Sequence, residues 1–175
     1  KVLDANCKNI PLVVDPVMFA KGGASLLDED AIMTLKEELI PLANLITPNI
    51  PEAEALAEMA EPKDGAELLA QQLLKLGPKA VLLKGGHRAG TDVHDFLISA
   101  NGCSESFSTS RIDSVNTHGT GCTLASAIAA ALAQGQELRD AVALGHKYVI
   151  EAIKSAPGFG HGHGPLNHAH TFSKE

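Results

Sequence analysis

The residues from Asn116 to Thr123 combine glycines, hydroxyls and a thiol directly before a run of small apolar residues, 124–133. We expect that run to be a helix, with Gly119 and Gly121 at its start. The first N–H groups of a helix lack intrahelical acceptors and carry partial positive charge, and glycines let an anion approach closely. The stretch fits an anion or phosphate cradle, although a tight turn with a helix cap uses the same residue types.

Cys122 lies in the first turn of this expected helix. A cysteine at a helix N-terminus has a depressed pKa and can act as a base or nucleophile. Residues Gly119 to Cys122, with Thr120 and Gly121 between them, are therefore candidates for a reaction at an anionic group.

Three short apolar runs earlier in the chain each end in residues that bind phosphate or metal. Asp15 follows the run 12–14, Thr47 follows 45–46, and Lys84 follows 80–83 and precedes two glycines. Ligands of open α/β sheets bind beyond the carboxyl ends of the strands, so we expect these positions and the helix start to share one edge. A turn-forming aspartate before proline and a strand-end lysine that extends to solvent are the structural alternatives.

Asn49 and Glu52 stand three residues apart across an expected helix start, with Pro51 at the first helical position. This spacing is typical of a capping pair, in which each side chain accepts a hydrogen bond from the backbone of the other. The functional alternative is a pair of oxygen ligands that holds hydrated Mg²⁺ beside a nucleotide.

The elements that must position these residues indicate an α/β fold with buried, mostly parallel strands. Asn101-Gly102 between two strand-like segments predicts an antiparallel hairpin near residues 95–112. We predict a single domain over residues 1–175, with a Gly/His-rich tail at 158–175 and helices over about 28–43, from Pro51, and over 64–76, 121–133 and 137–155.

Composition narrows the class of protein. With 45% hydrophobic and 3% aromatic residues, the core must consist of aliphatic side chains, and a net charge of −7 disfavours nucleic-acid binding. Three cysteines without paired spacing argue against a disulfide framework and for a reducing compartment. No apolar segment is long enough to span a membrane, so we expect a cytoplasmic protein that does not bind membranes.

The residue types match phosphoryl transfer: carboxylates and an amide for Mg²⁺, a lysine for phosphate charge, an anion cradle and a base. The Walker motif of P-loop enzymes is missing from the sequence, and so is the protein-kinase set of motifs. A kinase of another lineage is therefore expected.

Four segments together resemble the hydroxymethylpyrimidine/phosphomethylpyrimidine kinases of bacterial thiamin biosynthesis, which belong to the ribokinase-like superfamily. They are Asp15-Pro16-Val17-Met18, Thr47 to Glu52, Lys84-Gly85-Gly86-His87 and Asn116 to Thr123. The resemblance implies a three-layer α/β/α fold and phosphorylation of 4-amino-5-hydroxymethyl-2-methylpyrimidine, then of its monophosphate, with ATP and Mg²⁺. It also suggests a homodimer.

The resemblance assigns roles to the matching positions. Cys122 takes the place of the superfamily's catalytic base, which is Asp in most sugar and pyridoxal kinases. Lys84 would contact the ATP phosphates, and Asn49 with Glu52 matches the Asn-x-x-Glu motif that orders Mg²⁺ and its waters. The remaining expected contacts are those of Asp15, Thr47 and Thr117 with the nucleotide and of Val17 with the pyrimidine.

The N-terminus departs from the family pattern. Residues 1–8 read as the end of a helix without an initiator Met, and the family's first strands and most of its pyrimidine contacts would precede them. We expect an N-terminally truncated sequence that is inactive or barely active by itself.

Other functions remain open on sequence grounds. A Cys-type pyridoxal/pyridoxine kinase also acts on a hydroxymethyl group of a six-membered aromatic ring. A non-catalytic nucleotide-binding module would bind ATP without transfer. A metal-binding role of the tail histidines is a further alternative, but glycine-spaced histidines must be ordered at an entropic cost.

Overall fold

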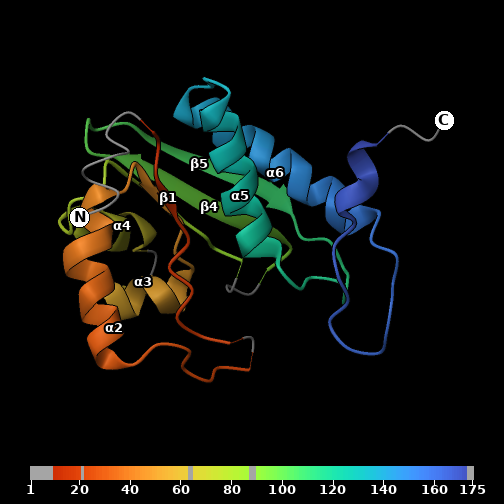
Figure 1. Cartoon of the computed structure of the whole chain (residues 1–175), viewed down its shortest axis with the longest axis horizontal. Coiled ribbons are helices and arrows are strands. Elements are labelled where there is room, and N and C mark those ends of the chain that lie inside the picture. Colours follow the sequence, from red (N-terminus) through yellow and green to blue (C-terminus); the bar gives the residue numbers. More distant parts are fainter. Residues whose placement is uncertain (1–9, 21, 63–64, 87–89, 173–175) are drawn as a thin grey trace. The chain divides into compact units, whose positions relative to one another are not determined.

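The computed structural model describes residues 10–20, 22–62, 65–86 and 90–172. The chain forms two compact units, Lys1–Ser110 and Arg111–Glu175, which are described separately below (Figure 1). The helix end predicted within residues 1–8 lies outside the described residues, as do Lys21 and His87. The expectation of a single domain stays a prediction.

The first unit is built on a five-stranded sheet whose strands follow one another in chain order. The first three strands are parallel, and the last two form the antiparallel hairpin. The strands are β1 (Val13–Val14), β2 (Leu45–Ile46), β3 (Ala80–Leu83), β4 (Asp92–Ser99) and β5 (Ser104–Ser110). The α/β class and the hairpin are thus confirmed. The hairpin extends from Asp92 to Ser110, rather than from 95 to 112, because the pairing includes the polar residues before Asp95 and ends where Asp92 pairs with Ser110.

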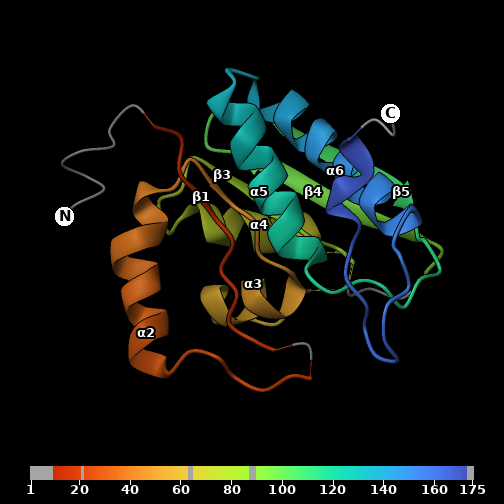
Figure 2. The ribbon, with the colours of Figure 1, turned by 45° about the vertical axis from the view of Figure 1, so that its right-hand side comes forward.

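The helices of the first unit lie beside its sheet (Figure 2). They are α2 (Glu29–Thr34), η1 (Leu35–Leu39), η2 (Ile40–Leu42), α3 (Ile50–Ala57) and α4 (Ala66–Leu74). The helix predicted over 28–43 exists, but it passes from α- to π- to 3-10 geometry. Pro41 accounts for the change, since proline has no N–H and cannot continue the hydrogen-bond pattern of an α-helix.

The core of the first unit consists of aliphatic side chains, as the composition predicts. Val81, Leu83 and Ile98 point from the sheet into a buried cluster that includes Leu69 and Leu73 of α4. Leu82, which alternates with these residues along β3, is buried as well. A strand that is buried on both faces is typical of the centre of an α/β sheet, and this burial fixes the end of β3, where Lys84 follows.

The second unit contains two long helices, α5 (Thr120–Ala133) and α6 (Leu138–Lys154), which lie side by side in both views (Figures 1 and 2). A glycine permits their close approach. A Cβ at Gly145 of α6 would lie 2.8 Å from Cγ1 of Ile128 and 3.1 Å from Cδ1 of Leu124. Small residues in this interface therefore hold α5 at a defined position on α6.

The end of the Gly/His-rich tail packs against α6. Leu166 is buried, and the N–H of Asn167 donates to the carbonyl of Ala152 at 3.0 Å. The short helix η3 (His168–Thr171) follows, in which the ring of His168 stacks on that of Tyr148 and the ring of His170 lies tilted against it. The tail thus serves as packing for the second unit.

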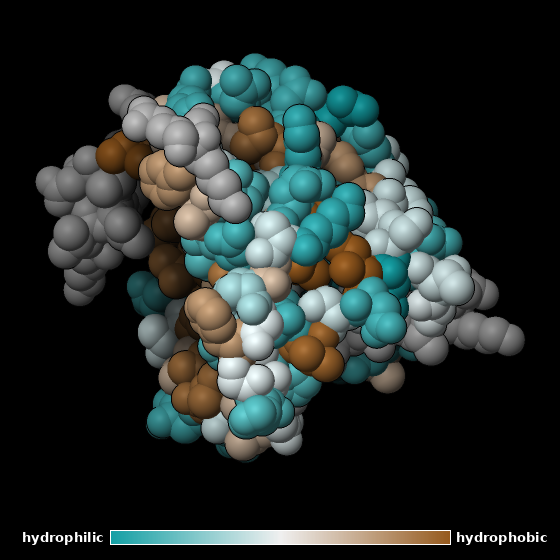
Figure 3. Space-filling model, turned by 90° about the vertical axis from the view of Figure 1, so that its right-hand side faces the viewer, coloured by the Kyte–Doolittle hydropathy of each residue, from teal (hydrophilic) through white to brown (hydrophobic). Residues whose placement is uncertain are grey.

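Exposed apolar side chains do not form one continuous surface on the face drawn in Figure 3, where apolar areas are separated by hydrophilic residues. Isolated apolar residues of this kind are normal on a protein surface. Within the described residues, every helix is too short or too polar to cross a bilayer.

Candidate active site

The ends of the three parallel strands bring together a group of residues that we call the strand-end cluster: Asp15, Thr47, Asn49, Glu52 and Lys84. The parallel register places Val14 opposite Ile46, and Ile46 opposite Val81. Beyond the strands, the N–H of Thr47 donates to the carbonyl of Val14 at 3.0 Å, and the N–H of Lys84 donates to that of Pro48 at 2.9 Å. The backbone thus continues the sheet to the residues that carry the polar side chains.

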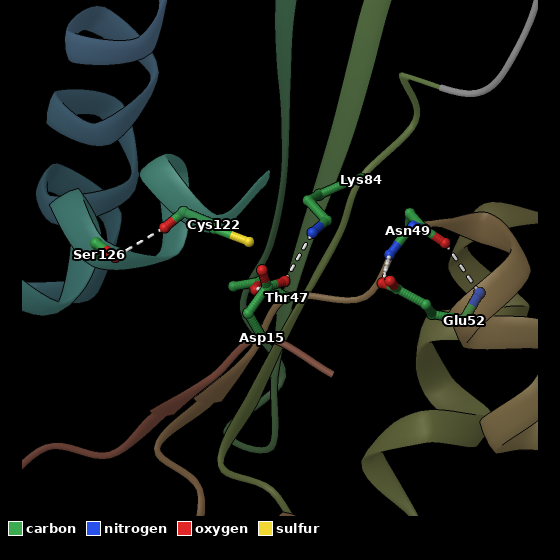
Figure 4. A network of polar contacts seen from close by, with 7 residues as sticks. All are labelled: Asp15, Thr47, Asn49, Glu52, Lys84, Cys122 and Ser126. Carbon is green, nitrogen blue, oxygen red and sulfur yellow. Dashed lines mark hydrogen bonds and ion pairs between the residues drawn. The ribbon is translucent and has the colours of Figure 1, made fainter. Parts of the chain in front are cut away.

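Asp15 is the centre of the cluster (Figure 4). Its Oδ1 accepts a hydrogen bond from Thr47 Oγ1 at 3.0 Å and forms an ion pair with Lys84 Nζ at 2.8 Å. The Asp15 and Lys84 side chains are each only 13% exposed. Little water therefore screens the pair, and removing either partner would leave the other charge buried and uncompensated.

The second carboxylate oxygen of Asp15, Oδ2, is buried and has no hydrogen-bond partner among the described residues. A buried oxygen of this kind normally has a donor or a cation. The strand-end cluster therefore has one acceptor position that its own side chains do not fill.

Asn49 and Glu52 form the capping box that their spacing predicts. The Asn49 side chain accepts from the N–H of Glu52 at 2.9 Å, and the Glu52 side chain accepts from the N–H of Asn49 at 2.8 Å. The local interpretation is confirmed, and it starts α3 immediately after β2. A role of the two residues in holding Mg²⁺ stays a prediction. The single side-chain oxygen of Asn49 and one carboxylate oxygen of Glu52 already accept bonds at the helix start.

Glu52 is almost completely buried. Burial raises the pKa of its carboxyl, while the hydrogen bond from Asn49 and the charge of Lys84 oppose the rise and the charge of Asp15 adds to it. Its charge thus responds to the same ion pair that Asp15 forms with Lys84. A buried carboxyl near opposite charges is a common feature of functional sites.

Val17 follows Asp15 in a tight turn, in which the N–H of Val17 donates to the carbonyl of Asp15 at 2.9 Å. Its side chain is 38% exposed, whereas Met18 beside it is fully buried. The exposed position is compatible with the predicted contact to a small aromatic substrate, and that contact stays a prediction.

The second unit carries the helix-start loop, which comprises Thr117 to Cys122. The helix α5 begins at Thr120, close to the predicted start, and Gly119 caps it with φ +82°. This left-handed conformation is one that glycine adopts readily. The hydroxyl of Thr120 donates to the carbonyl of Thr117 at 2.9 Å, and this bond closes the loop onto the helix.

Cys122 lies exposed in the first turn of α5 and outside any disulfide. Its carbonyl accepts a hydrogen bond from Ser126 Oγ at 2.8 Å, so the backbone of the first turn is held from within the helix (Figure 4). The predicted common edge of the helix-start loop and the strand-end cluster stays a prediction, because the two belong to different units.

Two contacts near these residues were not predicted from the sequence. Asp95, a buried residue of β4, accepts a hydrogen bond from the N–H of Gly85 at 2.8 Å. In the second unit, the N–H of His118 donates to the carbonyl of Gly164 in the tail at 3.3 Å. Both contacts join positions that only the folded chain brings together. The one available signal for the first was an acidic residue directly before the apolar run 96–98.

The structure gives no support to a metal site of protein ligands in the tail. Among the residues that the structure describes, which include all four tail histidines, three His, Cys, Asp or Glu side chains nowhere gather closely enough to hold an ion. The ring contacts with Tyr148 give His168 and His170 a packing role instead.

Solved structures identify the class of protein. The chain is 30% identical to Bacillus subtilis pyridoxal kinase, solved as an ADP complex, with a TM-score of 0.82 over 96% of this chain and 62% of that one. It is 42% identical to phosphomethylpyrimidine kinase from Clostridium difficile, with a TM-score of 0.72 over 87% and 60% of the two chains. The fold is thus the α/β fold of the ribokinase-like kinases.

Sequence relatives identify the family. The sequence profile described as phosphomethylpyrimidine kinase matches residues 1–167, so the chain belongs to the phosphomethylpyrimidine kinase family. The thiamine biosynthesis bifunctional protein ThiED of Geobacter sulfurreducens is 52% identical over 159 residues, 90% of this chain and 32% of that protein. The chain spans less than two thirds of the length of each of these three relatives.

Proposed function

We propose that the protein transfers the γ-phosphoryl group of ATP to the hydroxymethyl oxygen of 4-amino-5-hydroxymethyl-2-methylpyrimidine, and then phosphorylates the resulting monophosphate. Family membership and the names of the relatives support this substrate class. The observation that carries the proposal is the buried Lys84–Asp15 ion pair at the ends of parallel strands, with Thr47 bonded to the same oxygen. Such a site offers fixed charge to a phosphate group without the cost of reorganising water.

Lys84 is the cation that we assign to the ATP phosphates. Its ammonium is held at 2.8 Å from Asp15 and is mostly shielded from solvent. An ammonium in this position gains an interaction with a phosphate while it keeps its carboxylate partner. Asp15 and Thr47 thereby fix the direction from which Lys84 meets the nucleotide.

Mg²⁺ fits the donor set of the strand-end cluster. Asp15 Oδ2 is buried and unfilled among the described residues, and Glu52 supplies a second buried carboxylate. Oxygen ligands and retained waters are what Mg²⁺ requires, and bound Mg²⁺ would neutralise charge on the ATP phosphates. We assign Asp15 and Glu52 to the ion or its waters, and Asn49 to the placement of Glu52.

The helix-start loop supplies the remaining chemistry of the proposal. The first N–H groups of α5, at Gly119 to Cys122, would stabilise negative charge on the transferred phosphoryl group. Cys122 would accept the proton of the substrate hydroxyl, for which its exposed place in the first turn is suitable. Thr117, which accepts from the Thr120 hydroxyl, would lie on the nucleotide side.

A pyridoxal kinase is the second candidate, because the similarity to Bacillus subtilis pyridoxal kinase has the higher TM-score of the two solved structures above. ADP release by the natural full-length protein, measured side by side with the pyrimidine and with pyridoxal, separates the two. We expect a higher kcat/KM for the pyrimidine. A higher kcat/KM for pyridoxal would favour the second candidate, and ATP binding without ADP release would indicate a non-catalytic module.

We also propose that the protein is a homodimer of the cytoplasm, as the family resemblance suggests. Sedimentation velocity over a range of protein concentrations tests the dimer. A constant monomer mass at micromolar concentration would contradict it.

A further inference from the structure

Asp95 lies outside the strand-end cluster, yet it contacts the backbone next to Lys84. It belongs to β4, where it is 7% exposed, and its Oδ1 accepts from the N–H of Gly85 at 2.8 Å. Most buried positions in this sheet hold aliphatic residues. A buried carboxylate is costly unless it makes strong hydrogen bonds, so its presence at this position requires an explanation.

The hydrogen bond between Gly85 and Asp95 lies just beyond the last backbone pair of β3 and β4. The β3–β4 ladder runs from Ala80 opposite Ser99 to Leu83 opposite Phe96, and β3 ends at Leu83. At the next positions the side chain of Asp95, not a backbone carbonyl, takes the amide of Gly85. A carboxylate accepting from N–H gives a stronger bond than a neutral oxygen.

Gly85 approaches β4 so closely that no other residue fits without a shift. A Cβ at this position would overlap the carbonyl oxygen of His94, which is backbone and cannot rotate away. The close approach puts the amide of Gly85 within reach of Asp95. Gly85 and Asp95, ten positions apart in the sequence, thus depend on each other: the glycine permits the close approach, and the aspartate accepts the hydrogen bond.

The backbone of Lys84 is consequently fixed on both sides. Its own N–H donates to the carbonyl of Pro48 at 2.9 Å, and the following N–H donates to Asp95. Lys84 also forms a parallel bridge with Asn49. A lysine side chain has many rotamers, and the ion pair with Asp15 selects among them. The position of the ammonium then depends on how firmly the Cα of Lys84 is held.

We propose that Asp95 is a positioning residue: its carboxylate holds the Gly85 amide and thereby aims the Lys84 ammonium at the ATP phosphates and Asp15. The inference rests on the proposed kinase function, and it adds a residue that this proposal does not place in contact with ATP or the pyrimidine. In this proposal, Asp95 acts on the nucleotide through Lys84. This dependence distinguishes it from a residue that merely stabilises the sheet.

A double-mutant cycle in the natural full-length protein tests the dependence. Asp95→Ala leaves the Gly85 amide unsatisfied and should raise the KM for ATP about tenfold. In a Lys84→Met background the same change should have less than a twofold further effect, because the ammonium that it positions is gone. Asp95→Asn keeps an accepting oxygen and should raise the KM only about threefold.

Asp92→Asn is the matched control, since Asp92 lies exposed on the same strand. It should leave the KM for ATP unchanged. If Asp95→Ala does not fold, Asp95→Asn provides the same test. It should raise the KM for ATP about threefold in the wild type and leave it unchanged in the Lys84→Met background.

The Gly85 amide gives a readout that does not depend on turnover. Its hydrogen exchange should be faster in Asp95→Ala than in the wild type and intermediate in Asp95→Asn. An unchanged KM for ATP in an active Asp95→Ala enzyme, or an effect that adds in full to that of Lys84→Met, would overturn the inference alone. A wild-type protein without kinase turnover would instead overturn the proposed function.

Discussion

At the scale of single residues, Glu52 combines a structural task with the proposed chemical one. It caps α3, it is almost fully buried, and its charge interacts with those of Lys84 and Asp15. A neutral glutamine would cap the helix equally well. The negative charge therefore explains why this position holds a carboxylate. Keeping that charge buried lowers the stability of the folded protein.

This cost predicts a pH dependence of folding. Burial raises the pKa of Glu52 above its ordinary value of 4.5, so the folded state binds the proton more tightly than the unfolded state. The stability that this group contributes is present below pH 4.5 and is lost as the pH rises through the raised pKa. Urea unfolding of the wild type and Glu52→Gln across this range should show the variant gaining stability relative to the wild type with increasing pH.

The same Glu52→Gln variant should lose at least about tenfold in kcat, because a neutral amide binds a hydrated cation less strongly. A stability difference that does not change with pH would contradict the charge argument. Full kinase activity of the variant would contradict the assignment to Mg²⁺.

Cys122 provides a further prediction at this scale. Cys122→Ala should lower kcat by about a hundredfold or more and leave the KM for ATP nearly unchanged, since a proton acceptor acts in the transition state. Cys122→Asp should retain more activity than Cys122→Ala, because a carboxylate can also accept a proton. Cys103→Ala, at an exposed cysteine of the hairpin, is the control. Equal losses in kcat and ATP affinity would make the thiol a structural residue.

At the scale of elements, the contact between α5 and α6 depends on Gly145. A Cβ there would lie 2.8 Å from Ile128 and 3.1 Å from Leu124. Gly145→Ala should therefore destabilise the protein by about 1–3 kcal/mol through overpacking, despite the better helix propensity of alanine. Leu144→Ala, at the half-exposed neighbouring position, should change the free energy of unfolding by less than about 0.5 kcal/mol. A thermally stabilised Gly145→Ala variant would show that the helices can separate without cost.

The elements themselves could largely be predicted from the sequence, because periodicity and capping are local signals. The Asn49–Glu52 box, the Asn101-Gly102 hairpin and the helix starting near Gly121 all exist. The π- and 3-10 turns around Pro41 were not predicted, since the apolar spacing continues through them. Proline alone gave the signal, through its missing N–H.

Non-local contacts account for what could not be predicted. Asp95 and Gly85 come together only because β3 pairs with β4. The residues around each of them in the sequence predict no more than an ordinary strand and loop. The glycine spacing of the tail predicted an entropic cost of ordering it, yet Leu166 is buried and the N–H of Asn167 donates to the carbonyl of Ala152 in α6. The strand-end cluster, in contrast, followed from a general rule on where the ends of parallel strands lie.

At the scale of the whole molecule, the two units contribute different parts of the proposed reaction. The first carries the lysine–aspartate pair and the buried carboxylates, and the second carries the glycine-capped helix start with Cys122. Phosphoryl transfer requires both kinds of group. Loss of the charged residues of the first unit or of the helix start of the second should therefore abolish turnover. Only the loss of the charged residues of the first unit should strongly lower the affinity for ATP.

The most direct test of the central claim is pyrimidine-dependent ADP release by the natural full-length protein with ATP and Mg²⁺. We predict turnover that needs the hydroxymethylpyrimidine, and a Lys84→Met variant that loses ATP affinity as well as rate. Removal of Mg²⁺ with a chelator should abolish turnover, and its return should restore it. ATP binding with no pyrimidine-dependent release of ADP, or full activity of Lys84→Met, would contradict the account.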